Sequence, residues 1–125
     1  MAEIKQVSVM KRHPDLTMEQ FIELYESRHA KFGEVLFKNA KRYVRRYVQP
    51  MRNPLTGKVE ELDFDVIMEI WWDSQEELEA AMKGIATSGL IDQIRASGET
   101  LFASQNNPGF TVREYESPRG DASPA

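Results

Sequence analysis

The chain has 125 residues and contains no cysteine, so disulfides, thiolate metal sites and a cysteine nucleophile are excluded. It also lacks a glycine-rich phosphate loop, a nucleophile elbow and a dinucleotide-binding fingerprint. No apolar run approaches the roughly 20 residues that a membrane span requires, and the N-terminus shows no basic region followed by an apolar block. We therefore expect a single cytoplasmic domain that has no membrane partner.

Histidine is scarce, since His13 and His29 are the only two. A turn and most of a helix should separate them, and no carboxylate repeats beside them at ligand spacing, so we expect no metal site. His13 precedes a proline in a turn, where a solvated side chain is expected.

Basic residues are also outnumbered, with 16 against 20 acidic ones, and the formal charge of −4 argues against a nucleic-acid partner. One basic cluster, between Lys41 and Arg46, is interleaved with tyrosine and valine. Because Arg45 and Arg46 would lie on opposite faces of a strand, a stacking surface for RNA is not expected. Solubility, an ion pair or capture of an anionic ligand are the alternative roles for this cluster.

A capped amphipathic helix is the most informative segment that is present. Thr17 followed three residues later by Gln20 is a capping-box pattern. One face of the helix then carries residues three or four positions apart: Met18, Phe21, Tyr25, His29, Phe32 and Leu36. Tyr25 and His29, one turn apart, can act on the same small volume. An imidazole that ionises near neutral pH can serve there as general acid or base, and the phenol can orient a substrate oxygen. The structural alternative is a core histidine bonded to a backbone carbonyl.

Alternation and turn signals predict the order β-α-β-β-α-β. Strands are expected at 4–12, 43–49, 64–72 and 110–115, a helix at 17–37, a hairpin loop at 52–61, and helical stretches from 74 and over 90–102. This order is that of the α+β, ferredoxin-like split βαβ fold, with an antiparallel sheet and both helices on one face. The tail, residues 117–125, is rich in Pro, Gly, Ser and Asp and is predicted to be disordered, which leaves residues 1–116 as the domain.

The strand at 64–72 is apolar on both faces. Val66, Ile70 and Trp72 lie on one side, whereas Ile67 and Trp71 lie on the other side with two carboxylates. Because a solvated sheet face should not carry Trp71 and Ile67, we expect a second copy of the sheet to cover it and form a homodimer. The alternative is that the loop or the tail folds over this face.

The carboxylates on that second side are Asp65 and Glu69, which can shift each other's protonation. Catalysis or orientation of a histidine by Asp65 is one interpretation. A structural ion pair with Arg45 or Arg113 is the other.

Several segments together resemble the EthD-domain family of the dimeric α+β barrel superfamily. The likeness covers nearly the whole chain up to about residue 116. The segments that carry it are Met10-Lys11-Arg12, Leu16-Thr17-Met18-Glu19-Gln20-Phe21, Tyr25-Glu26 with His29, Phe64-Asp65-Val66, Glu69-Ile70-Trp71-Trp72-Asp73-Ser74 and Val112-Arg113-Glu114.

The resemblance implies a homodimer with facing sheets and, in each subunit, a ligand cavity between helices and sheet. Related proteins include muconolactone isomerases, polyketide cyclases, decarboxylases, dehydratases and quinol-forming monooxygenases, which mostly need no metal or organic cofactor. It also implies that His29 is the general acid or base. The chain departs from the isomerase pattern because its second strand carries Tyr43, Tyr47 and arginines in place of a second histidine.

We therefore predict a cofactor-independent lyase or isomerase that decarboxylates, dehydrates, cyclises or isomerises a small cyclic or aromatic polyketide-like or lactone substrate. The predicted catalytic residues are His29, Tyr25 and Asp65. The predicted substrate-binding residues are Phe21, Phe32, Tyr43, Tyr47 and Trp72. Two alternatives stay open: a non-catalytic ligand-binding accessory protein for an oxygenase or catabolic pathway, and a cofactor-free or haem-dependent monooxygenase.

Overall fold

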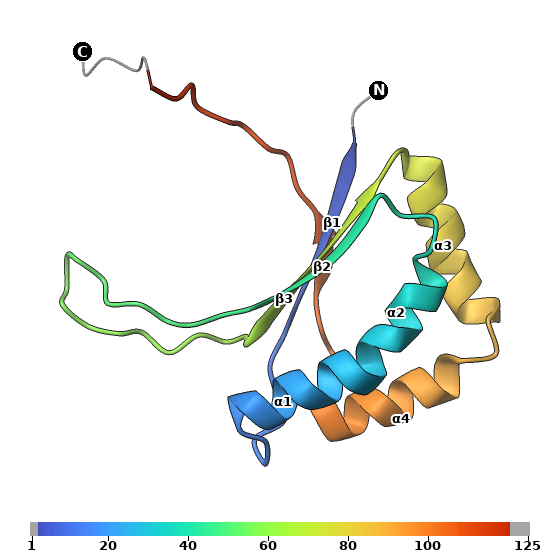
Figure 1. The fold of residues 1–125 in the computed structure, drawn as a ribbon, viewed down its shortest axis with the longest axis horizontal. Helices are drawn as coiled ribbons and strands as arrows, with labels where there is room; N and C mark the ends of the chain where they lie inside the picture. The colour runs from blue at the N-terminus through green and yellow to red at the C-terminus, as the bar shows by residue number, and fades with distance from the viewer. Residues whose placement is uncertain (1–2, 121–125) are drawn as a thin grey trace.

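The computed structural model describes residues 3–120 as a four-stranded antiparallel sheet with helices packed on one side (Figure 1). In chain order the elements are β1 (Ile4–Met10), α1 (Met18–Leu24), the π-helical segment η1 (Tyr25–His29), α2 (Ala30–Leu36), β2 (Arg42–Tyr47), β3 (Val66–Trp72), α3 (Gln75–Thr87), α4 (Ile91–Leu101) and β4 (Gly109–Thr111). The strand order is β2-β3-β1-β4, and each neighbouring pair is antiparallel. This confirms the predicted α+β, ferredoxin-like fold.

The capping box at the start of α1 forms as predicted. The Gln20 amide N–H donates to Thr17 Oγ1 at 3.1 Å, and the Thr17 amide donates to Gln20 Oε1 at 2.9 Å. The helical stretch then continues to residue 36, but its middle turn is η1, where the Ala30 amide donates to the Tyr25 carbonyl five residues back. The sequence did not predict this wider turn, which lies in the segment that carries Tyr25 and His29.

The core lies between the helices and the covered sheet face. Val66 and Ile70 of β3 and Phe21 of α1 are fully buried, and Leu101 of α4 closes the layer. Strand β3 pairs with β1 so that Ile70 lies opposite Gln6 and Met68 opposite Ser8. The predicted division of β3 into two faces is therefore observed.

The other face of the sheet is apolar but partly shielded by cations of the same chain. Trp71 is only 9% exposed, and two cations lie over its ring, with Lys5 Nζ 4.8 Å and Arg42 Cζ 4.5 Å from the ring centroid. Glu69 pairs with Arg46 at 3.0 Å and with Lys5 at 3.6 Å. The predicted ion-pair partners, Arg45 and Arg113, were therefore wrong for Glu69.

All four strands are shorter than predicted, and β2 ends at Tyr47 where residue 49 was expected. β1 ends at Met10 because the Arg12 amide donates to Asp65 Oδ2 at 2.9 Å, so the chain leaves the ladder. β3 begins only at Val66, and β4 ends at Thr111, where its neighbouring residues are exposed. The separation of the two C-terminal helical stretches is observed, and Gly89 occupies the left-handed region with φ of 79°.

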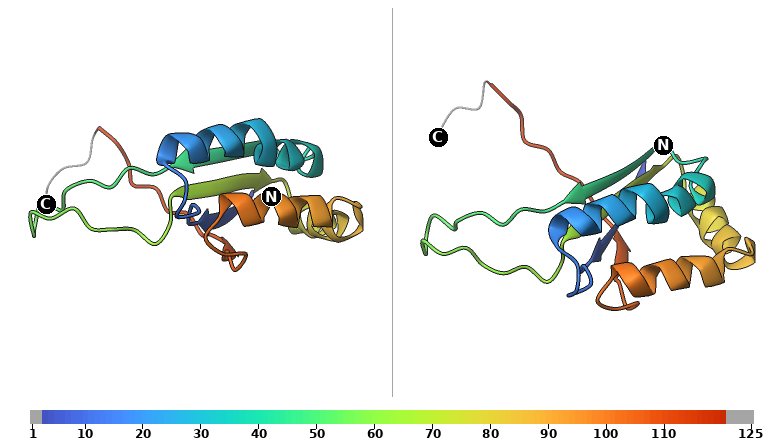
Figure 2. Two further views of the ribbon diagram at one scale, coloured as in Figure 1. Left: turned by 90° about the horizontal axis from the view of Figure 1, so that it is seen from below. Right: turned by 60° about the horizontal axis from the view of Figure 1, so that its bottom comes forward.

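Residues 48–65, between β2 and β3, form a long hairpin that extends away from the helices (Figure 2). Its strands touch at an Arg52–Val59 bridge, which agrees with the predicted loop. Residues 112–120 lie outside any helix or strand and are exposed, whereas the remainder of the predicted disordered tail, 121–125, lies outside the described residues. Within residues 3–120, no helix has the length and apolar character needed to span a membrane.

Candidate functional site

His29 lies at the end of η1, where it faces helix α4. Its Nδ1 atom is 2.9 Å from the Ser97 hydroxyl oxygen, and its ring packs edge-on against Tyr25 and Phe102 at 5.3 and 5.2 Å between centroids. A π-helical turn inside a helix is rare and is frequent at functional sites. The hydroxyl can donate to or accept from Nδ1, so it supports either neutral tautomer of the imidazole.

Burial lowers the pKa of His29 from 6.5 to about 4, because the surroundings disfavour the charged imidazolium. The expectation of an ionisation near neutral pH was therefore wrong. The imidazole is neutral at physiological pH, with one ring nitrogen engaged by Ser97 and the other able to exchange a proton.

A cavity of about 150 Å³ lies beside His29, between the helices and the sheet. Its wall is formed by Ser8, Met10, Tyr25, His29, Phe32, Gly33, Leu36, Phe37, Tyr43, Met68, Ile85, Ile94 and Asn107. None of these lining residues carries a formal charge while His29 is neutral. Such a wall favours an uncharged ligand, because an ion would lose its hydration without gaining a partner.

Two tyrosine hydroxyls supply most of the polar chemistry of this cavity. Tyr25 is 1% exposed and burial raises its pKa well above 10, whereas burial raises the pKa of Tyr43 to about 12. Both phenols therefore stay protonated and can donate to a ligand oxygen.

Tyr43 reaches the cavity by crossing directly over Gly33. A Cβ atom at Gly33 would lie only 2.4 Å from the Tyr43 hydroxyl oxygen. The Arg45 guanidinium also lies over the Tyr43 ring, 4.7 Å from the ring centroid. Glycine is therefore required at position 33 for this placement of the phenol.

Arg45 is in turn held by Glu26, a residue of η1. Glu26 accepts from Arg45 Nε at 3.0 Å and Nη2 at 2.5 Å, and from the Tyr47 hydroxyl at 2.5 Å. The hydrogen bond from Arg45 lowers the pKa of Glu26, so the carboxylate is charged at neutral pH. This cluster ties η1 to β2 and thereby fixes Tyr43 relative to His29.

The structure brings together four of the predicted site residues, because His29, Tyr25, Phe32 and Tyr43 line one cavity. The other four lie outside that wall. Phe21 is in the core, the Tyr47 hydroxyl donates to Glu26, and Trp72 Nε1 donates to Gln6 Oε1 at 2.9 Å. Asp65 accepts from the Arg12 amide at 2.9 Å and lies 3.5 Å from Lys11 Nζ, which anchors the end of β1.

Sequence reasoning missed Ser97, the partner of His29. A signal existed, because Ile94, Ser97 and Leu101 recur at helical spacing and form the inward stripe of α4. It also missed Ser8 and Asn107, which add polar groups to the cavity wall. No local pattern distinguishes those two residues from ordinary strand and turn positions.

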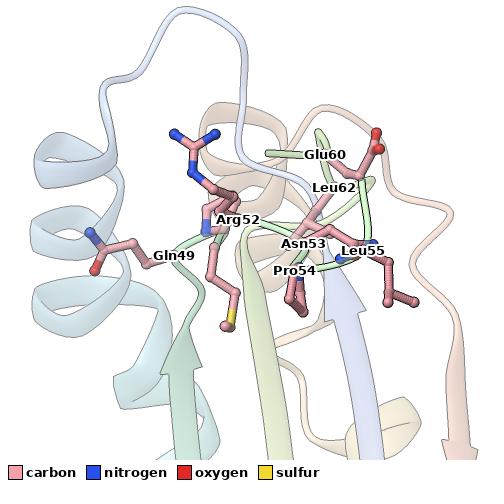
Figure 3. Close-up of a pocket in the computed structure, with 9 residues that line it drawn as sticks. Gln49, Arg52, Asn53, Pro54, Leu55, Glu60 and Leu62 are labelled. Carbon is pink, nitrogen blue, oxygen red and sulfur yellow. The ribbon is translucent and has the colours of Figure 1, made fainter. Parts of the chain in front are cut away.

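A hollow of about 520 Å³ in the hairpin is a different feature (Figure 3). Its lining residues all belong to the hairpin between Gln49 and Leu62, and none is a histidine or tyrosine. Leu55 at its edge is 93% exposed. It is therefore less enclosed than the His29 cavity, and its one carboxylate, Glu60, is exposed to solvent.

The residues present do not fit a haem or a metal centre. Within residues 3–120, no group of three His, Asp or Glu side chains could hold a metal ion. An apolar cavity of about 150 Å³ accommodates one benzene ring, so the four-pyrrole haem macrocycle is too large for the space beside His29.

The comparisons with known proteins agree with this fold. The EthD domain model matches residues 13–90. An EthD family protein from Bacillus halodurans shares 19% identity over 91% of this chain and 100% of its own, with a TM-score of 0.57. A dimeric ferredoxin-like protein of unknown function from Bacteroides fragilis shares 10% identity, with coverages of 90% and 96% and a TM-score of 0.53. SnoaB from Streptomyces nogalater, a cofactor-independent oxygenase, shares 11% identity, with coverages of 96% and 100% and a TM-score of 0.52. No curated protein sequence matches the chain.

Proposed function

Because the chain belongs to the EthD domain family, we propose that it is a cofactor-independent lyase or isomerase that moves a proton on a small, uncharged cyclic or aromatic substrate. The observation that carries this proposal is a neutral His29 beside an uncharged, ring-sized cavity that also contains two tyrosine hydroxyls. His29 is the general acid and base, and Tyr25 and Tyr43 donate to the substrate oxygen.

The proposed reaction begins with transfer of a proton from a carbon beside a carbonyl group to the free nitrogen of His29. The electron pair moves onto the carbonyl oxygen, where a phenol hydroxyl stabilises the enolate. The imidazolium then returns its proton to another carbon in an isomerisation, or to a leaving hydroxyl in a dehydration. A pKa of about 4 makes His29 a weak base and its conjugate acid a strong one, which suits a carbon activated by a second unsaturated group.

The uncharged wall also ranks the predicted reactions. A decarboxylase substrate carries a carboxylate, which needs a cation or several N–H donors in a buried site. Among the residues lining the cavity there is no lysine or arginine. Isomerisation, cyclisation and dehydration of neutral substrates are therefore favoured over decarboxylation.

The test uses cyclohex-3-enone, a neutral ring of suitable size that isomerises to the conjugated cyclohex-2-enone. Ultraviolet absorbance follows the product, and NMR in D₂O follows exchange at the carbon next to the carbonyl. His29→Ala should lower the rate at least about a hundredfold, and Tyr25→Phe should lower it less. His13→Ala is the matched control and should leave the rate unchanged, since His13 lies in the turn before α1.

Circular dichroism shows whether each variant is folded, and His29→Asn replaces His29→Ala if the latter unfolds. Wild-type activity in a folded His29 variant would contradict the proposal. Saturable binding without isomerisation or exchange by the wild type would favour the ligand-binding accessory function.

A cofactor-free oxygenase is the second candidate. The likeness to SnoaB shows the fold alone, but the uncharged wall with its phenol donors also suits a neutral hydroquinone. Deprotonation by His29 would give the electron-rich anion that reacts with O₂. Oxygen consumption with hydroquinone, lost in His29→Ala, would support this candidate over the isomerase.

We also propose that the protein is a homodimer formed through the helix-free sheet face. The 45% exposed Phe110 and the half-buried Ile67 on that face support it, whereas Val7 and Trp71 on the same face are already largely covered within the chain. Trp71→Glu should replace the apolar ring beside Lys5 and Arg42 with a charged group, weaken the interface and yield monomer or aggregate. Light scattering that finds a folded wild-type monomer at micromolar concentration would contradict the homodimer.

A further inference from the structure

A second hollow of about 260 Å³ adjoins the His29 cavity along helix α2. Leu36 is the residue that lines both spaces. On the far side of Leu36 the hollow is bounded by Trp72 from β3 and by Ala81 and Gly84 from α3. Leu36 therefore separates a ring-sized cavity from a larger neighbouring space.

Helix α3 leaves this space open. None of its 13 residues is buried, although Ile85 lines the His29 cavity and Ala81 and Gly84 line the second hollow. A Cβ atom at Gly84 would meet no other atom within 4 Å. The small residues Ala81 and Gly84 of α3 thus leave a hollow beside α2 that no side chain of residues 3–120 fills.

The two spaces have compatible chemistry. Neither wall contains a lysine or an arginine among the residues that line it, so neither favours an anion. The polar groups of the second hollow are the Asn39 amide and the Glu77 carboxylate, which accept hydrogen bonds from hydroxyl or amino groups. About 150 and 260 Å³ together also reach the 300–1,000 Å³ typical of small-molecule sites, which the His29 cavity alone does not.

We propose that the two hollows form one elongated ligand site in which Leu36 is the movable wall. This inference rests on the proposed function and extends its substrate class. The substrate is a neutral molecule longer than one ring, whose reacting ring lies beside His29. Its second part passes Leu36 toward Ala81 and Gly84 and carries a hydroxyl or amino group near Glu77.

The test compares two neutral probes, phenol and biphenyl-4-ol, by NMR titration of the protein. In the wild type, phenol should shift amide signals around His29 only, whereas biphenyl-4-ol should also shift those of Ala81 and Gly84. Gly84→Leu, which fills the second hollow, should weaken the binding of biphenyl-4-ol at least about tenfold and change the affinity for phenol by no more than about twofold. Leu36→Ala should increase the affinity for biphenyl-4-ol relative to the affinity for phenol.

Ala86→Leu is the matched control, since it adds the same side chain at an exposed position of α3. It should leave both affinities unchanged. If Gly84→Leu does not fold, the wild-type shifts decide. The elongated site would be overturned if biphenyl-4-ol shifted only the signals around the His29 cavity. It would also be overturned if Gly84→Leu reduced the affinities for both probes equally.

Because these measurements read binding, they separate this inference from the proposed reaction. If biphenyl-4-ol does not bind while phenol binds normally and isomerisation depends on His29, the elongated site alone would be contradicted. Absence of any phenol shift around His29 in the wild type would overturn the proposed function and the elongated site together.

Discussion

Replacing Gly33 with alanine tests how the Tyr43 phenol is placed in the cavity. The added Cβ would lie 2.4 Å from the hydroxyl oxygen and 2.5 Å from Cζ of Tyr43. Ordinary contacts between such atoms are about 3.5–4.0 Å, so the ring must move by about 1 Å or more. Movement of the ring is restricted by Arg45, which lies over it and is bound by Glu26. The substitution should therefore strain this layer and displace the phenol that lines the cavity.

The matched control is Gly84→Ala. Both glycines lie within helices, so both substitutions gain about 1 kcal/mol of helix propensity. At Gly84 a Cβ has open space, and we expect that gain in full, with a melting temperature higher by about 3–5 °C. At Gly33 the clash should cost about 1–3 kcal/mol, which leaves the variant between unchanged and about 2 kcal/mol less stable.

Urea and thermal unfolding measure the difference in the free energy of unfolding between the two variants. The gain in helix propensity is common to both and cancels in this difference. Phenol titration should show weaker binding in Gly33→Ala and normal binding in Gly84→Ala. Adding Tyr43→Leu to Gly33→Ala should recover part of the lost stability, with a coupling of about 0.5–3 kcal/mol. Equal stability of the two alanine variants together with normal phenol binding by Gly33→Ala would refute the reasoning.

Three further predictions concern charge and the chain end. His29 has a pKa of about 4 in the folded state and 6.5 in the unfolded state, so the unfolded state binds more protons between these pH values. The free energy of unfolding should therefore fall by roughly 3 kcal/mol as the pH decreases from 6.5 to 4. Urea unfolding should show a smaller loss in His29→Gln. Glu26→Gln should cost about 1–2 kcal/mol because the guanidinium of Arg45 loses its ionic partner, whereas the exposed Glu23→Gln should be neutral by the same assay. Deletion from Ser117 onward should leave the melting temperature and particle mass unchanged, and a loss of several degrees would indicate that the tail packs.

Local patterns predicted most of the fold. The Thr17 cap marked the start of α1, and the two-faced pattern of residues 64–72 marked β3. The helical stretch predicted from residue 74 is α3, where the Ser74 side chain accepts from the Glu77 amide. Strand ends were less predictable, because β1 ends where the Arg12 amide meets the Asp65 carboxylate, a contact between residues far apart in the chain. Such long-range partners leave no periodic signal in the sequence.

The candidate site was predictable only where helical periodicity applied. Tyr25, His29 and Phe32 share one stripe and do line the same cavity. Phe21 belongs to that stripe too but faces the core, because the helix extends beyond the end of the cavity. Trp72 was expected near His29 and instead lines the neighbouring hollow, since its position depends on sheet register and on the distance between α2 and α3.

The π-helical segment η1 also determines how the two halves of the long helix are phased. Its wider turn contains one residue more than an α-helical turn would use, as the Ala30 bond to the Tyr25 carbonyl shows. If the same residues adopted α-helical spacing, α2 would rotate by about 100° relative to α1, whereas removing one residue, such as the exposed Ser27, would restore α-helical spacing and keep the present phase. Without the wider turn and without such a deletion, α2 would take the rotated phase. The faces that carry Phe32 and Leu36 would then turn away from the sheet, although no lining residue had changed. The wider turn between Tyr25 and Ala30 is therefore a determinant of cavity shape in its own right.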